Sequence, residues 1–369
     1  MPRYHSALFS VPLRDAGLVE FAADDLGTLS VIRDVIVECS HSDKFPAEER
    51  SDQELTLRYE DQKRLLHLLS KLQHKLQPKH AQGAQCRISY HDDDVGEGDV
   101  KQANTAIDNN ERGWIPLSEL FGEVGGRSVS DYILHRMFTT YLQPIVQPSG
   151  DIVGYEFLLR PLPEQVPFRP KELFATARKI GQHSFLDRAA RHSAIRMSAS
   201  HLQSGMKRFI NFLPSSLHHP TTCLRDTFDM MRMTDTDPTD YVFEVMESEP
   251  LDDPRLIDVF DTYRSEGVRL ALDDVGTGFA TLDVVDRLQP DYVKIDRRWI
   301  SQCENNPVKQ RYIDDLIARV SQFNGVLLAE GVERHEEWDY LRKAGVSLFQ
   351  GYLFGHAKPV PTPIAASAL

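Results

Sequence analysis

The sequence predicts an α/β protein in which a TIM-type (β/α)8 barrel follows a smaller N-terminal α/β region. From about Ser128 onward, short apolar strands alternate with longer helical patterns, which is typical of parallel α/β architecture. The stretch 128–362, about 235 residues, suits one eight-stranded barrel better than two smaller domains. At 369 residues the chain exceeds the usual size of a single core, so one large and one smaller domain are expected.

Composition narrows the class of function. A hydrophobic content of 41% is ordinary for a globular protein, and a net charge of -13 argues against extended nucleic-acid binding. A phosphate-bearing ligand is compatible with this charge, because bound divalent cations can invert the local field. No apolar run could span a bilayer and no signal peptide is evident, so we expect no membrane insertion and a cytoplasmic location. The cysteines are scattered, which predicts reduced thiols: Cys39, Cys86, Cys223 and Cys303.

The N-terminal region carries a strand-like run at Leu29–Val37 and a helical pattern from Glu54 that ends at Pro78. The helical pattern places leucines on one face: Leu65, Leu66, Leu68, Leu69, Leu72 and Leu76. We expect this stripe to pack on its own domain; the alternative is a helix used for dimerisation, and we also expect a homodimer.

The stretch 78–112 has the composition of turns and loops, interrupted by a short strand at Arg87–Tyr90. We therefore expect three parts: an N-terminal region of residues 1–127, a barrel of residues 128–362 and a tail of residues 363–369. The N-terminal region contains no Gly-Gly-Asp-Glu-Phe motif, so a fused cyclase is not indicated. Sensing, docking of a partner and assistance in dimerisation remain open for it.

The barrel region shows helical patterns between its predicted strands, at 171–180, 185–199, 254–266, 308–323 and 336–344. Polar residues follow the apolar strands directly: Glu156, Asn211, Glu244, Asp273 with Asp274, Lys294, Glu330 and Gln350. In a parallel barrel these strand ends converge on the face that holds the active site. Each residue taken alone is more readily explained as a strand-end cap. The adjacent pair Asp273–Asp274 taken alone fits a solvated turn and a metal site equally well. The strand-end explanation fails for the whole set.

Oxygen ligands without histidine or cysteine select Mg²⁺ or Mn²⁺ over zinc or copper. Two such ions are the usual device for in-line attack of water on a phosphodiester, and the gathered carboxylates would otherwise repel one another strongly. The sequence thus predicts a two-metal site at the barrel mouth.

These residues lie within motifs that resemble the EAL family of cyclic di-GMP phosphodiesterases. The matching motifs, in order, are Gln143–Val146, Tyr155–Arg160, Asn211 with Pro214, Glu244–Glu247, Asp273–Gly278, Pro290–Asp296, Ala329–Glu333 and Gln350–Phe354 with Pro359. The resemblance covers about residues 128–362. It implies a TIM-type barrel with one irregular strand, two Mg²⁺ or Mn²⁺ ions, and hydrolysis of cyclic di-GMP to linear pGpG.

The resemblance also implies roles. The metal ligands would be Glu156, Asn211, Glu244, Asp273, Asp274 and Glu330, with Asp273 bridging. The residues assigned to catalysis are Lys294, which would orient or help activate the attacking water, together with Glu330, Glu156 and Asp273. The residues assigned to ligand binding or its support are Gln143 and Arg160 on the substrate, Gln350 on the water network, Glu247 on the loop from Val275, and Asp296.

The chain departs from the family pattern at Phe157, Met246, Val275 and the pair Ala280–Thr281, which replace an alanine, a threonine, a phenylalanine and a Ser-Ser pair. These departures bear on loop gating, metal affinity and turnover, not on the ligand set. Two alternatives follow: a cyclic di-GMP receptor that binds without cutting and signals through the N-terminal region, and a barrel enzyme that uses Mg²⁺ on a phosphorylated metabolite.

Overall fold

The computed structural model describes residues 12–40, 48–51, 54–90, 113–216, 220–246, 251 and 255–361. The chain divides into two compact units, one of residues 1–137 with 161–186 and the other of residues 138–160 with 187–369.

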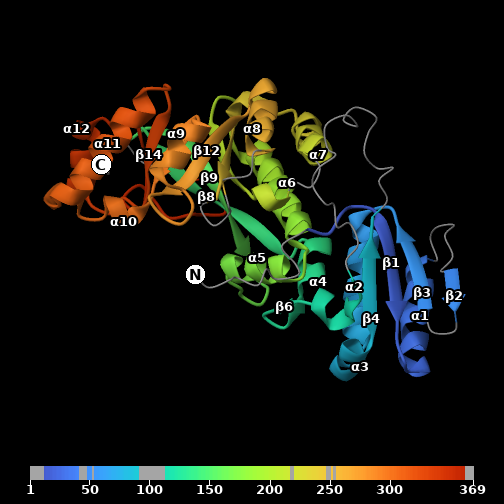
Figure 1. Ribbon diagram of the computed structural model, residues 1–369. Coiled ribbons are helices and arrows are strands. Elements are labelled where there is room, and N and C mark those ends of the chain that lie inside the picture. Colours follow the sequence, from blue (N-terminus) through green and yellow to red (C-terminus); the bar gives the residue numbers. More distant parts are fainter. Residues whose placement is uncertain are drawn as a thin grey trace. The chain divides into compact units, whose positions relative to one another are not determined.

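The first unit contains a five-stranded antiparallel sheet with the order β2-β3-β1-β4-β5 (Figure 1). Its strands are β1 (Gly17–Ala22), β2 (Glu48–Ser51), β3 (Glu54–Tyr59), β4 (Gln85–Ser89) and β5 (Ile115–Pro116). Its helices are α1 (Leu26–Ser40), α2 (Gln62–Lys75), α3 (Pro78–Gly83), α4 (Val129–Leu134) and α5 (Pro170–Lys179), and β6 (Glu123–Val124) pairs with β7 (Arg127–Ser128). The strand predicted at residues 87–90 is confirmed as β4.

Three predictions for this unit are wrong. The stretch expected to form turns and loops from residue 78 begins with helix α3, which has Pro78 at its first position. The run Leu29–Val37 is helical, because its buried side chains recur at helix spacing and Asp25 caps the helix by accepting hydrogen bonds from the backbone of Gly27 and Thr28. The β-branched residues in this run misled the sequence reading. Residues 54–59 form strand β3, and the helix begins only at Gln62, after Asp61 accepts a bond from the Arg64 amide.

The leucine stripe of α2 is fully buried within a single chain, where α2 contacts α1 and α4. Packing on its own domain is therefore confirmed, and little apolar surface of this helix is left for a second copy.

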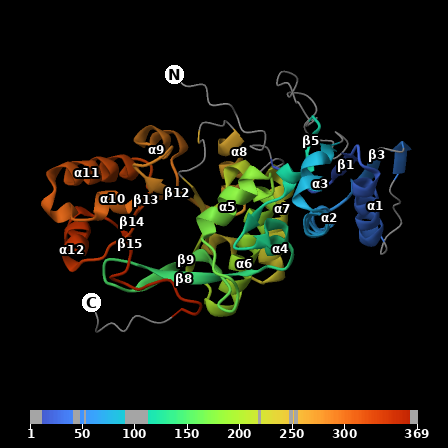
Figure 2. The same cartoon turned by 90° about the horizontal axis from the view of Figure 1, so that it is seen from below.

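The second unit contains a closed eight-stranded barrel with the order β10-β11-β12-β13-β14-β15-β8-β9. Its strands are β8 (Phe138–Val146), β9 (Ile152–Pro161), β10 (Lys207–Phe212), β11 (Tyr241–Val245), β12 (Arg269–Val275), β13 (Tyr292–Ile295), β14 (Val326–Ala329) and β15 (Leu348–Gln350). Strands β9 to β15 pair in parallel, whereas β8 runs antiparallel to β15 and lies beside β9 (Figure 2). The predicted TIM-type barrel with one irregular strand is confirmed.

The helices outside the barrel are α6 (His183–His201), α7 (Pro220–Met233), α8 (Arg255–Ser265), α9 (Leu282–Leu288), α10 (Arg297–Ile300), α11 (Pro307–Ser321) and α12 (His335–Ala344), with 3-10 turns at Pro214–Ser216, Pro238–Asp240 and Cys303–Asn305. All five helices predicted in the barrel region are present; α4, α7, α9 and α10 were not predicted. None of the helices in the described residues is long and apolar enough to cross a membrane.

The barrel interior is filled by one apolar layer formed by Ile145, Phe209, Val242, Ala271 and Leu328, with Tyr292 and Leu348 against it. Alternate residues of the same strands point outward and pack beneath the helices. This layer is the apolar floor of the barrel mouth. The interior positions that follow it on each strand line the mouth.

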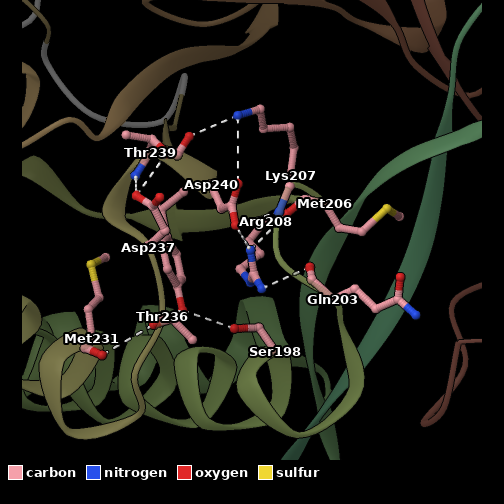
Figure 3. Close-up of polar contacts among 12 residues, drawn as sticks. Ser198, Gln203, Met206, Lys207, Arg208, Met231, Thr236, Asp237, Thr239 and Asp240 are labelled. Carbon is pink, nitrogen blue, oxygen red and sulfur yellow. Dashed lines mark hydrogen bonds and ion pairs between the residues drawn. The ribbon is translucent and has the colours of Figure 1, made fainter.

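At the other end of the strands, a buried ion pair joins β10 to the turn before β11. The Arg208 guanidinium lies 2.7 Å from the Asp240 carboxylate and also donates to the Met206 and Gln203 carbonyls (Figure 3). Lys207 donates to the Thr239 carbonyl in the same cluster. These contacts join the starts of β10 and β11, so they serve stability and not chemistry.

Candidate active site at the barrel mouth

Six of the site residues predicted from the sequence occupy equivalent positions, each two residues after a member of the apolar floor. They are Asn211, Glu244, Asp273, Lys294, Glu330 and Gln350, which follow Phe209, Val242, Ala271, Tyr292, Leu328 and Leu348. Because side chains alternate along a strand, a residue two positions beyond an interior one also faces the barrel axis. The repeating pattern thus delivers these polar groups to one place.

Lys294 is the centre of the site. Its Nζ lies 2.7 Å from Glu244 Oε1, 2.8 Å from Asp273 Oδ1 and 2.7 Å from Glu330 Oε1, and 3.7 Å from Glu156 Oε1. The lysine side chain is completely buried. A single ammonium therefore touches carboxylates that arise from four different strands or the loops after them.

Burial alone would lower the pKa of Lys294, but the charges of Asp273, Glu156, Glu244 and Glu330 outweigh it and raise the pKa well above its usual value. Lys294 is therefore fully protonated at neutral pH. The protonated lysine can donate hydrogen bonds and stabilise negative charge.

Burial has the opposite result for two of the carboxylates. It raises the pKa of Glu244 well above the usual range, with Glu156 and Asp273 adding to the rise and Lys294 opposing it. Burial likewise raises the pKa of Glu330, again against Lys294, with Asp273, Glu156 and Asp274 adding to it. One ammonium is too little positive charge for this many carboxylates.

Three of the carboxylates form a compact cluster. Asp273, Asp274 and Glu330 each offer an oxygen atom, and these atoms lie within 4.8 Å of one another. The pairing of β12 with β13 shifts register between Leu272 and Val275, so both aspartates fall in an irregular segment, and Asp274 has a positive φ of 48°. This distortion lets adjacent residues turn toward the same point.

The residues fit divalent cations. The cluster consists only of oxygen donors, and Glu244 is fully buried with a carboxylate oxygen, Oε2, that has no hydrogen-bond partner within the described residues. An ionised carboxylate buried without a partner is costly, and hard cations with oxygen ligands offset that cost. The ligand chemistry thus matches Mg²⁺ or Mn²⁺.

Glu156 is the anchor of a second network. Gln350 donates from Nε2 to Glu156 Oε2 at 2.6 Å, and Asn211 donates from Nδ2 to Glu156 Oε1 at 3.4 Å. Burial would raise the pKa of Glu156, but Lys294, Gln350 and Asn211 together lower it below the usual value. Glu156 is therefore held ionised and in one orientation.

Three of the remaining predicted residues make contacts outside this cluster. Gln143 donates to the Gly355 carbonyl at 3.4 Å, Arg160 donates to the neighbouring Leu159 carbonyl, and Asp296 caps helix α10 by accepting from the Arg298 amide. Glu247 lies outside the described residues. Roles for these four in ligand binding stay predictions.

The sequence reasoning missed how the loops that carry the cluster are packed. Gly276 and Gly331 follow close after Asp274 and Glu330, and both have positive φ values and neighbours where a Cβ would be. The glycines were visible in the sequence as loop residues, but the side chains against them were not.

The fold and the site together define a TIM-like barrel protein whose mouth gathers carboxylates around a buried lysine. The EAL domain family model matches residues 127–357, well over half of the chain, and the protein therefore belongs to the EAL domain family.

Similar proteins and solved structures are consistent with membership of this family. The chain is 29% identical over 247 residues to the probable cyclic di-GMP phosphodiesterase PdeN of Escherichia coli, which covers 64% of this chain and 46% of that protein. The crystal structure of a standalone EAL protein from Vibrio cholerae in a c-di-GMP bound form is 29% identical, with a TM-score of 0.57, and covers 63% of this chain and 97% of that one. The manganese and cyclic di-GMP complex of Klebsiella pneumoniae BlrP1 is 27% identical, with a TM-score of 0.55. That match covers 60% of this chain and 56% of the BlrP1 chain. The chain spans less than half of PdeN.

Proposed function

We propose that this protein is a phosphodiesterase that hydrolyses cyclic di-GMP to linear pGpG and depends on two Mg²⁺ or Mn²⁺ ions. The observation that supports this most strongly is the carboxylate set around Lys294, with the Asp273–Asp274–Glu330 cluster beside it. The relatives that bind or are named for cyclic di-GMP supply the substrate class.

The proposed metal ligands are Glu156, Asn211, Glu244, Asp273, Asp274 and Glu330. When bound, the ions would stabilise charge on the phosphoryl oxygens and lower the pKa of a bound water so that hydroxide is available near neutral pH. They would also stabilise the ionised forms of Glu244 and Glu330, which burial disfavours.

The chain's own residues would position the reactants. Lys294, held protonated, donates hydrogen bonds to the attacking water and offsets negative charge that develops on the phosphate. Gln350 keeps Glu156 ionised and oriented through the 2.6 Å hydrogen bond. Lys294 would therefore orient or help activate the attacking water.

We further propose that residues 128–362 form the catalytic barrel and residues 1–127 a region that regulates it or assists formation of a homodimer in the cytoplasm, with residues 363–369 as a tail. We assign substrate contacts to Gln143 and Arg160, and support of the mouth to Glu247 and Asp296.

The test is a hydrolysis assay on the full chain with Mg²⁺ or Mn²⁺, in which pGpG is separated from cyclic di-GMP by chromatography. We expect product from the parent chain and none from Glu156→Ala, while Arg342→Ala, an exposed substitution on α12, retains turnover. Tight binding without product would instead establish the non-cleaving receptor. A chain that ignores cyclic dinucleotides but cleaves a phosphorylated metabolite would refute both.

A further inference from the structure

Helix α10 is a single turn that lies between the two loops carrying the carboxylate cluster. It begins directly after β13, the strand that bears Lys294, and Asp296 caps it. The loops on its two sides follow β12 and β14, which flank β13 in the barrel. Two side chains of this turn, Trp299 and Arg297, occupy the space beside a glycine in each loop.

Trp299 packs on the loop after Asp274. A Cβ on Gly276 would lie 2.3 Å from Trp299 Nε1 and 2.5 Å from the Tyr312 hydroxyl, so only glycine fits there. The Trp299 and Tyr312 rings are stacked with centroids 3.8 Å apart at 15°, and the indole N–H points to the Gly276 carbonyl at 3.4 Å. The stacked rings of Trp299 and Tyr312 thus support this loop.

Arg297 packs on the loop after Glu330 in the same manner. A Cβ on Gly331 would lie 2.6 to 2.8 Å from Cγ, Cβ and Cδ of Arg297. The arginine also forms an ion pair with Glu333 in that loop, with 2.8 Å between Nη2 and Oε2. The contact at Gly331 is made by the aliphatic stem, and the ion pair only holds the end of the side chain.

We propose that α10 is a brace for the cation site, in which Trp299 and Arg297 are positioning residues that fix Asp274 and Glu330 at the spacing a divalent ion requires. This inference rests on the cation site of the proposed function. The carboxylates repel one another, so packing from outside must hold their loops together before a cation arrives. Outer supports of this kind usually change metal affinity by about 10- to 100-fold.

The first test measures Mn²⁺ binding to the full chain by calorimetry, without substrate. We expect Trp299→Ala to weaken Mn²⁺ binding by about 10-fold or more. Trp299→Phe should recover most of the affinity, because it keeps a ring against Tyr312 and loses only the long hydrogen bond. Trp114→Ala is the matched control, since Trp114 is a partly exposed tryptophan of the first unit that contacts Arg87.

The second test separates packing from charge at Arg297. Arg297→Met keeps the stem beside Gly331 and loses the ion pair, so it should retain Mn²⁺ affinity within about threefold, whereas Arg297→Ala should lose about 10-fold. Arg342→Ala is the control, because it removes a comparable exposed ion pair, with Asp339, from α12. Thermal unfolding of each variant in chelator shows that the chain is folded when affinity is measured.

The outcomes distinguish this inference from the proposed function. If Trp299→Ala and Arg297→Ala bind Mn²⁺ as tightly as the parent, the brace is refuted even when the parent hydrolyses cyclic di-GMP. If the variants weaken binding and the parent still yields no product, the brace stands and the proposed hydrolysis is wrong. A parent chain that binds no Mn²⁺ would overturn both.

Discussion

Replacing Lys294 by methionine tests the charge balance of the barrel mouth. Methionine keeps the length of the side chain but removes the ammonium that lies within 2.8 Å of Glu244, Asp273 and Glu330. Because the lysine is completely buried, water cannot take its place easily. Removing one partner of a buried ion pair costs about 3–5 kcal/mol, so we expect the free energy of unfolding to fall by that amount in chelator.

Urea unfolding followed by circular dichroism measures this loss, once with EDTA and once with excess Mn²⁺. Mn²⁺ should recover part of the loss, because a bound cation offsets the same carboxylates and stabilises only the folded chain. Turnover should fall by about 100-fold or more even when Mn²⁺ restores folding, since the water and phosphate lose their hydrogen-bond donor. Lys207→Met is the control, because that lysine is partly exposed and lies 4.0 Å from Asp240 at the other end of the barrel.

A Lys294→Met chain that unfolds within about 1 kcal/mol of the parent in EDTA would refute the reasoning, since that is the scale of an exposed ion pair. It would mean that the carboxylates are already neutral without the lysine.

Three further predictions follow. Glu244→Gln should leave the unfolding free energy in chelator unchanged or higher, because burial already disfavours the carboxylate charge. The same substitution should weaken Mn²⁺ binding in calorimetry. A large loss of stability in chelator would contradict this reasoning. Incubation with EDTA should abolish turnover and Mn²⁺ should restore it; hydrolysis that survives exhaustive chelation would exclude the cation site from the mechanism. Burial and Arg191 lower the pKa of His192 from 6.5 to about 4. Between pH 6.5 and about 4 the unfolded chain therefore binds a proton on His192 that the folded chain does not. The free energy of unfolding should fall by up to about 3 kcal/mol as the pH drops through this range. The unfolding free energies of His192→Gln and the parent should agree at pH 7.5 and separate below pH 6; parallel curves over that range would show that His192 is not involved.

The chemistry of the site was predictable from the sequence because it lies on strands. A strand alternates strictly, so a polar residue two positions beyond a buried one must face the same side, and parallel strands bring such positions together. Lys294 and Glu244 were identifiable for that reason alone. The contacts of Trp299 and Arg297 depend instead on how a one-turn helix lies between loops, and no periodicity encodes that.

In the N-terminal unit, too, contacts distant in sequence limited what the sequence could predict. The run 29–37 is rich in β-branched residues and reads as a strand, but its burial follows helix spacing once it packs in the unit. Residues 54–59 form a strand because they pair with β2 on one side and with β1, which is distant in sequence, on the other. Helix packing decided the first segment, and sheet pairing decided the second.

The departures from the family pattern lie mostly on the side of the strands that faces away from the site. Phe157 is buried in the layer between barrel and helices, as alternation requires of the residue after Glu156. Val275 and Ala280 are completely buried in that same layer, beneath the loop that contains Gly276. A smaller residue at position 275 therefore changes what supports the loop and leaves the carboxylates untouched. These departures therefore lie in the packing under the mouth, where the stacked pair of Trp299 and Tyr312 also lies. We expect them to change turnover and metal affinity through the position of the loop, while the ligand set stays the same.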